Sequence, residues 1–134
     1  MRIKYLHLVV FSVMILTLSG GCTGADPKEP PSGSKIIEIT QGGFSPQTLT
    51  INAGDTVAWI NKDTVAHWPA SANHPTHEVY PESGGCIGSK FDTCHALANG
   101  ENFAFTFKEK GEWKYHDHLN CCTNPAFFGT IIVK

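Results

Sequence analysis

The 134-residue sequence has almost no methionine, no run of basic residues and no segment with convincing helical periodicity. Its two methionines are Met1 and Met14, so the rest of the chain has no thioether to offer a metal. Lys and Arg total 10 against 12 Asp and Glu, and no basic cluster exists, which argues against nucleic acid as a partner. No Ser/His/Asp or Cys/His pattern has the spacing of a nucleophilic catalyst. The composition therefore points away from nucleic-acid binding and from hydrolysis.

The first 21 residues have the pattern of a signal peptide. A positively charged start precedes an apolar run, Leu8 to Leu18, which is too short to span a bilayer comfortably. The run leads into Ser19-Gly20-Gly21-Cys22, which resembles a bacterial lipobox. We predict cleavage of residues 1–21, lipidation of Cys22, and a flexible tether over residues 22–34, with plain secretion as the alternative. The mature protein would be an exported, membrane-anchored lipoprotein facing the periplasm or the cell exterior.

The remaining residues, 35–134, suffice for one domain with a modest core. Short β-branched or alternating segments separated by turn signals predict an all-β, antiparallel sandwich. Between about residues 61 and 100 the strand signal is weak, and a loop of this length is usually functional or cross-linked. The predicted strands cover 35–40, 48–51, 56–61, 102–107, a segment starting at 113, and 129–133.

Four cysteines follow Cys22 in a chain whose export would permit disulfides. Cys86 and Cys94 lie inside the long loop, and we predict a disulfide between them that contributes roughly 2–3 kcal/mol. Two free buried thiols are the alternative. Cys121 and Cys122 could form a vicinal disulfide, pair with the 86/94 region, or bind metal, and the sequence does not choose among these.

The segment from Trp113 to His118 concentrates aromatic and metal-binding side chains. On a strand, Trp113, Tyr115 and Asp117 would share one face, and His116 and His118 the other. A second cluster, His67, His74 and His77, lies in the long loop, whereas His95 has the character of a solvated surface residue. Imidazoles with a carboxylate suit Cu(II), and also Zn or Ni.

Three pieces of this domain together resemble the cupredoxins, the small blue-copper proteins. They are the run from Thr48 to Trp59, then Asn61-Lys62-Asp63 followed by His67, and Gly111 to Tyr115 combined with Gly129 to Val133. The resemblance implies a Greek-key β-sandwich of seven or eight strands with a copper ion at one end. It also implies that His67, which follows the Asn-x-Asp signature, is a copper ligand.

The other copper ligands of the family are missing from the matching positions of this sequence. Asp117 stands in the place of the cysteine, Asn120 in that of the second histidine, and Phe127 in that of the axial methionine once residues 121–124 are treated as an insertion. A blue site depends on a copper–thiolate bond, so this resemblance implies a non-blue site. The motif His116-Asp117-His118 is also loosely similar to the His-Cys-His signature of multicopper oxidases.

We expect one Cu(II) to bind through His67 and the pair His116/His118, with Asp117 as a ligand or as a residue that orients one. The two paired histidines start on the outer face, so His74 or His77 completes the site if they cannot turn inward. The resulting function is electron transfer or copper handling at the outer face of a membrane, with a redox partner protein. Alternatives are a small copper-dependent oxidoreductase and a metal-free binding module.

Overall fold

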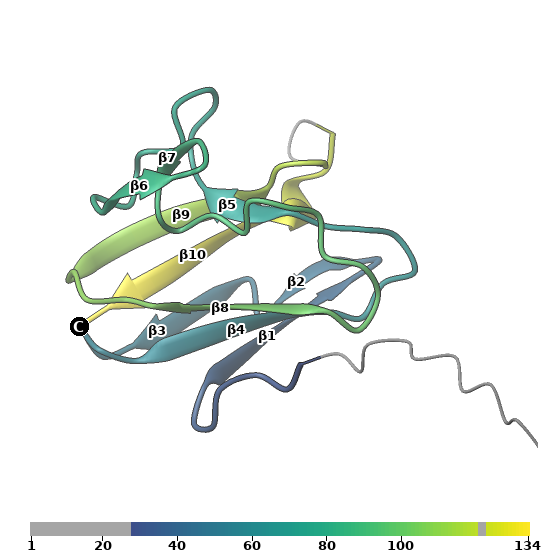
Figure 1. Cartoon of the computed structure of the whole chain (residues 1–134), viewed down its shortest axis with the longest axis horizontal. Coiled ribbons are helices and arrows are strands. Elements are labelled where there is room, and N and C mark those ends of the chain that lie inside the picture. Colours follow the sequence, from purple (N-terminus) through teal and green to yellow (C-terminus); the bar gives the residue numbers. More distant parts are fainter. Residues whose placement is uncertain (1–27, 121–122) are drawn as a thin grey trace, which may run out of the picture.

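Two four-stranded sheets packed face to face form the domain in the computed structural model, which describes residues 28–120 and 123–134 (Figure 1). One sheet has the strand order β2-β1-β4-β8, the other β3-β10-β9-β5, and β6 pairs with β7 in a separate ribbon. The all-β sandwich predicted from the sequence is confirmed. The elements are β1 (Lys35–Thr40), β2 (Gly43–Ser45), β3 (Thr48–Ile51), β4 (Thr56–Asn61), β5 (Pro69–Ser71), β6 (Ser83–Gly85), β7 (Gly88–Ser89), β8 (Asn102–Thr106), β9 (Gly111–Asp117), a 3₁₀ turn η1 (Pro125–Phe127) and β10 (Phe128–Val133).

Two strand pairs depart from the predicted antiparallel arrangement. β1 runs parallel to β4, and β3 runs parallel to β10. Between β1 and β4 the chain passes through β3, which belongs to the other sheet, so no tight hairpin forces the two strands to run in opposite directions.

The core lies between the sheets and is largely aromatic. Trp59 of β4 is completely buried, and its ring centroid lies 5.1 Å from that of Phe91 and 5.3 Å from that of Tyr115. Phe107 is also buried, with Phe103 and Phe105 packed against the same cluster, as the alternation of residues 102–107 predicts. The inner face of β9 is therefore anchored firmly, which leaves its outer face to carry other chemistry.

The long segment between β4 and β8 is organised by short strands and one cross-link. β5 extends the second sheet, and Figure 1 shows the β6–β7 ribbon on the outer side of that sheet. The predicted disulfide between Cys86 and Cys94 is present, with their Cα atoms 5.6 Å apart. A segment with weak strand signal is thus held by a covalent bond rather than by regular pairing.

Several predictions concern residues outside the described ranges. The signal peptide, lipidation of Cys22, residues 22–27 of the tether, and the role of Cys121 and Cys122 all fall there. Within residues 28–120 and 123–134, no helix is long and apolar enough to cross a membrane.

Candidate metal centre

Strand β9 presents its histidine on the face opposite the core and then ends abruptly. Tyr115 and Asp117 point inward and are completely buried, while His116 faces outward beneath the long loop. The strand stops at Asp117, because the Asp117 carboxylate accepts hydrogen bonds from Leu119 N at 3.1 Å and from Asn120 Nδ2 at 2.6 Å. This side-chain turn redirects the backbone, so that His118 no longer follows the regular strand geometry.

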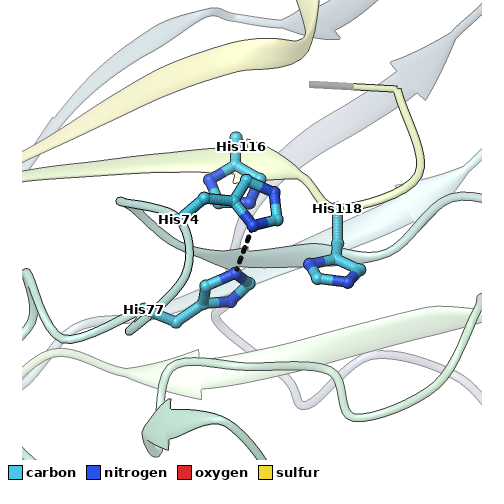
Figure 2. A group of neighbouring side chains, drawn as sticks. All are labelled: His74, His77, His116 and His118. Carbon is cyan, nitrogen blue, oxygen red and sulfur yellow. Dashed lines mark hydrogen bonds between the residues drawn. The ribbon is translucent and has the colours of Figure 1, made fainter. Parts of the chain in front are cut away.

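The second half of the site arrives from the segment after β5. β5 pairs antiparallel with β9, with Ala70 opposite His116, and the pairing continues in a bond from Ala72 N to Lys114 O at 2.9 Å. The chain then folds over the outer face of β9, as Figure 2 shows, and brings His74 and His77 onto it. His77 has a left-handed backbone, with φ of 52°, which is uncommon for a non-glycine residue and is often found at functional sites.

The four histidines His74, His77, His116 and His118 converge on one point. Each offers one ring nitrogen, and these four atoms lie within 4.8 Å of one another. Five of the six ring-centroid distances are 4.8–4.9 Å, and the sixth, between His116 and His118, is 6.2 Å. If the four ring centres lay in one plane, five equal distances would make the sixth √3 times as long. The observed 6.2 Å is much shorter than that, so the four ring centres form a distorted tetrahedron.

The chemistry of this four-histidine site fits a metal ion. His116 Nε2 and His118 Nδ1 are buried without a hydrogen-bond partner in the described part of the chain. A buried polar atom of this kind is costly and normally has an explanation such as an ion. Four imidazole nitrogens are a donor set that Cu(II) accepts, and Zn(II) as well.

Burial and neighbouring charges keep His77 and His116 in the neutral form, which is the form that binds a metal. Burial, reinforced by repulsion from the neighbouring histidines, lowers the pKa of His116 to about 4. The pKa of His77 is lowered for the same reasons, against an opposing contribution from Asp92. At neutral pH each of these two rings therefore keeps one nitrogen without a proton, which can bind a metal.

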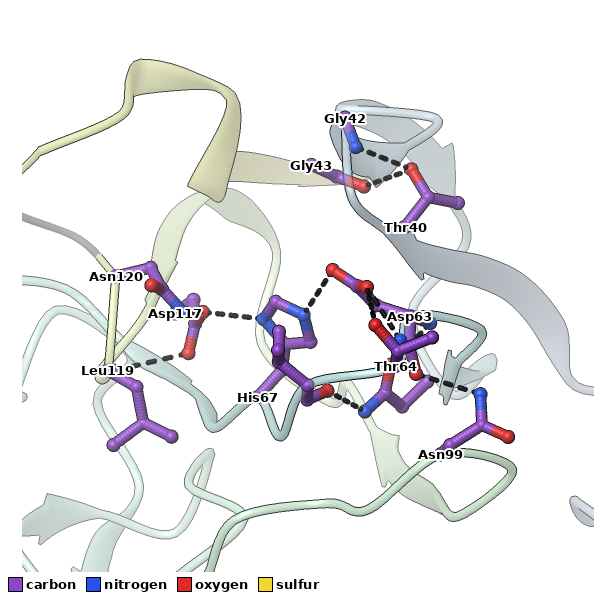
Figure 3. Close-up of polar contacts among 12 residues, drawn as sticks. Thr40, Gly42, Gly43, Asp63, Thr64, His67, Asn99, Asp117, Leu119 and Asn120 are labelled. Carbon is purple, nitrogen blue, oxygen red and sulfur yellow. Dashed lines mark hydrogen bonds and ion pairs between the residues drawn. The ribbon is translucent and has the colours of Figure 1, made fainter.

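His67 lies in a different environment, held between two carboxylates (Figure 3). Its Nδ1 is 2.7 Å from Asp117 Oδ2 and its Nε2 is 3.1 Å from Asp63 Oδ2, with all three residues buried. Asp117, predicted as a copper ligand or as a residue that orients one, thus lies against His67. Both ring nitrogens of His67 are thus engaged by protein acceptors.

This arrangement favours a charged imidazolium. Burial alone would lower the pKa of His67, but the hydrogen bonds and charges of Asp117 and Asp63 outweigh it and raise the pKa. The carboxylate of Asp117 has a lowered pKa in turn, because its bonds to His67 and to backbone N–H groups outweigh its burial. The Phe127 ring stacks on His67 at 5.1 Å, in the position that the sequence assigned to an axial ligand. We call His67, Asp63 and Asp117 the clamp.

Comparison with known proteins identifies the family of the chain. Residues 34–134 match the model of the copper-binding proteins of the plastocyanin/azurin family. The chain belongs to this family. Its predicted identity as a cupredoxin is confirmed, and with it copper as the cofactor and electron transfer as the type of function, at the level of the family.

Individual relatives are distant. Amicyanin from Paracoccus denitrificans is 24% identical over 106 residues, which cover 79% of this chain and 70% of amicyanin. L-ascorbate oxidase from Cucurbita maxima is 31% identical over 112 residues, which cover 78% of this cupredoxin but 18% of that enzyme.

Solved structures show the same fold. A reduced amicyanin variant superposes with a TM-score of 0.58 at 20% identity, over 79% of this chain and 87% of that one. A purple cupredoxin from Nitrosopumilus maritimus gives a TM-score of 0.53 at 26% identity, over 74% and 98% of the two chains.

The structure thus separates the predicted ligands of this cupredoxin into two groups. One group consists of His74, His77, His116 and His118, and the other, His67 with Asp117, belongs to the clamp. Among the described residues, no group of three or more possible metal ligands includes His67. His95 is exposed, as expected. Sequence reasoning missed Asp63 as the second carboxylate of the clamp, although it lies in the Asn-x-Asp signature, and missed Asp92, which no motif marks.

Proposed function

We propose that this protein is an exported cupredoxin that binds one copper ion at the four-histidine site and acts in electron transfer or copper handling. The observation that carries the proposal is the convergence of four ring nitrogens within 4.8 Å on the outer face of β9. Copper is favoured over other divalent ions by the family of the chain and by its place in the affinity order for nitrogen ligands.

The site would be non-blue, because its four donors are imidazoles and none is a thiolate. When bound, copper would supply a one-electron redox centre, and the chain's own residues would set its affinity and its access. His74 is exposed while His77 and His116 are buried, so one edge of the site faces solvent. An electron partner or a copper-delivering protein would approach at this edge.

In this proposal the clamp lies where the family usually holds its metal, and an ion pair between His67 and the two carboxylates is present there instead of a copper ligand. A ring with both nitrogens already hydrogen-bonded to carboxylates would have to give up one of them to bind a metal. The cationic form that the clamp favours would also repel a metal ion. His67 therefore has a structural role in this proposal, and the copper ligands are His74, His77, His116 and His118.

A titration of the purified full-length protein with Cu(II) tests this assignment. We expect one equivalent to bind, with nitrogen hyperfine structure in the EPR spectrum and no intense thiolate-to-copper absorption. His77→Ala should lose stoichiometric binding, whereas His67→Gln should keep it. Loss of copper binding in His67→Gln but not in His77→Ala would show that copper binds at the family's usual position, with His67 as a ligand. An intense blue band would instead make Cys121 or Cys122 a ligand.

We further propose that the mature chain is tethered to the outer face of a membrane through lipid on Cys22. Support comes from the signal-like start, the small residues before Cys22 and the disulfide, which is typical of an exported domain. Mass spectrometry of the membrane fraction should find a diacylglyceryl group on Cys22. An unmodified terminus beyond Cys22 would refute the tether.

A further inference from the structure

One buried carboxylate near the four-histidine site has an oxygen that nothing yet explains. Asp92 is 4% exposed and lies opposite Ala70 of β5. Its Oδ1 accepts hydrogen bonds from Trp68 Nε1 at 2.7 Å and from Cys94 N at 2.8 Å. Its Oδ2 has no hydrogen-bond partner in the described part of the chain. Such an oxygen normally has a function or an unseen partner.

The nearest candidate partner is the ring of His77. Asp92 Oδ2 lies 3.7 Å from His77 Nδ1, and both side chains are completely buried. That nitrogen also has no hydrogen-bond partner among the described residues. The other nitrogen of the same ring, Nε2, faces the site and lies 3.4 Å from His74 Nδ1 (Figure 2). A buried carboxylate oxygen and a buried ring nitrogen, both without a hydrogen-bond partner among the described residues, therefore face each other on the side of His77 away from the four-histidine site.

We propose that Asp92 is the positioning residue of the copper site, which accepts the Nδ1–H of His77 and so presents Nε2 to the metal. This inference rests on the proposed function. A metal-bound imidazole commonly donates its second ring N–H to a carboxylate, which fixes the tautomer and makes the ligand more basic. A closer approach of roughly 0.5–1 Å would bring the pair into hydrogen-bond range.

The surroundings of Asp92 suit this role, because they hold the carboxylate in place from the side away from His77. Trp68 contributes its N–H to Asp92, and its ring packs against His118 at 4.9 Å. Cys94 contributes its backbone N–H and is joined to Cys86 by the disulfide. The disulfide loop also holds His77 itself, through a bond from Ser89 N to His77 O at 3.0 Å. The cross-linked loop thus fixes both members of the pair.

The variant Asp92→Asn tests the inference with little change of shape. Its amide oxygen can still accept from Trp68 and Cys94, while its NH₂ would confront the N–H of His77. We expect Cu(II) to dissociate 10–100-fold more readily in a chelator competition, as removal of such a partner typically produces. If the loss falls on Cu(II) alone, each factor of ten raises the reduction potential by about 59 mV.

Asp55→Asn is the matched control, since Asp55 is a carboxylate that accepts one backbone N–H, from Asn52 at 2.9 Å, in the turn between β3 and β4. Its copper affinity and potential should equal those of the wild type. The copper-free forms of both variants are compared by thermal unfolding, so that a general loss of structure is recognised. A copper affinity and potential of Asp92→Asn equal to the wild-type values would overturn the inference while leaving the proposed function intact.

A second measurement needs no variant and covers the case in which Asp92→Asn does not fold. In the Zn(II)-loaded wild-type protein, ¹⁵N NMR of the histidine rings should show His77 bound through Nε2, with a slowly exchanging proton on Nδ1. Metal on Nδ1, or a proton there that exchanges at the solvent rate, would overturn the role of Asp92. A wild-type protein that binds no metal at all would refute the proposed function and the inference together.

Discussion

Replacing Asp117 with Asn should be among the most damaging single changes in this domain. The carboxylate is completely buried and takes part in four hydrogen bonds, with His67 Nδ1, Trp68 N, Leu119 N and Asn120 Nδ2. In the variant, the amide oxygen can keep the two backbone bonds to Oδ1. Its NH₂ group would replace Oδ2 and confront the N–H groups of His67 and Asn120.

The size of the effect follows from breaking a buried ion pair. Removing one partner of such a pair costs about 3–5 kcal/mol, because the other charge stays buried with less compensation. A domain of this size is stable by about 5–15 kcal/mol, so the melting temperature should fall by at least about 12 °C. The loss should be greatest below the ordinary pKa of histidine. The raised pKa of His67 means that its contribution is present below that value and is lost as pH rises through the folded-state pKa.

Urea unfolding of the copper-free protein measures this loss of stability. The wild type, Asp117→Asn, His67→Gln and the double variant are compared in a double-mutant cycle. The two single variants should be coupled by about 1–3 kcal/mol, because once one charge is gone the other contributes little. The coupling should shrink when the cycle is repeated at a pH above the folded-state pKa of His67. Additive effects, or a loss below about 0.5 kcal/mol for Asp117→Asn, which is ordinary for a surface site, would show that the clamp is not an ion pair.

Three further outcomes are expected. Removing the disulfide with Cys86→Ser and Cys94→Ser, which are eight residues apart, should lower the free energy of unfolding by about 2.5 kcal/mol in urea titrations; an unchanged midpoint would contradict this. Because burial and the neighbouring histidines lower the pKa of His116 to about 4, its ring should stay neutral at pH 5 in an NMR titration of the copper-free protein; protonation of His116 between pH 6 and 7 would contradict the lowered pKa. Gly129→Ala would place its Cβ 2.2 Å from Tyr115 Cζ, so thermal unfolding should show a loss of about 1–3 kcal/mol, and an unaltered melting temperature would show that the ring can move aside.

The sequence carried more information about the clamp than about the four-histidine site. Alternation along β9 places Asp117 on the inner face with Tyr115, and a buried carboxylate requires a partner. The family signature places His67 opposite, and the two meet at 2.7 Å. Both steps depend on local periodicity and on one motif, which are properties of the sequence itself.

The four-histidine site depended on contacts that no local pattern encodes. His74 and His77 reach His116 and His118 because β5 pairs with β9 and the following segment folds over the outer face of that strand. The two clusters are about 40 residues apart, so their meeting is set by strand register and loop closure rather than by periodicity. The role of Asp92 could not be predicted for the same reason, since its partners Trp68 and His77 come from other parts of the loop.

Sequence alone therefore determined the six longer strands, the sandwich and the family, because each rests on alternation, turn residues or a motif with fixed spacing. The disulfide was predicted from the closeness of Cys86 and Cys94 in one loop, whereas the short strands β2, β5, β6 and β7 were not predicted. Tertiary structure decided which histidines lie together. The side-chain turn at Asp117 ends β9 and lets His118 join His116, and the loop after β5 closes over both. A ligand set drawn from two faces and two distant segments exists only once the sheets have paired, since only then do these nitrogens share one small volume.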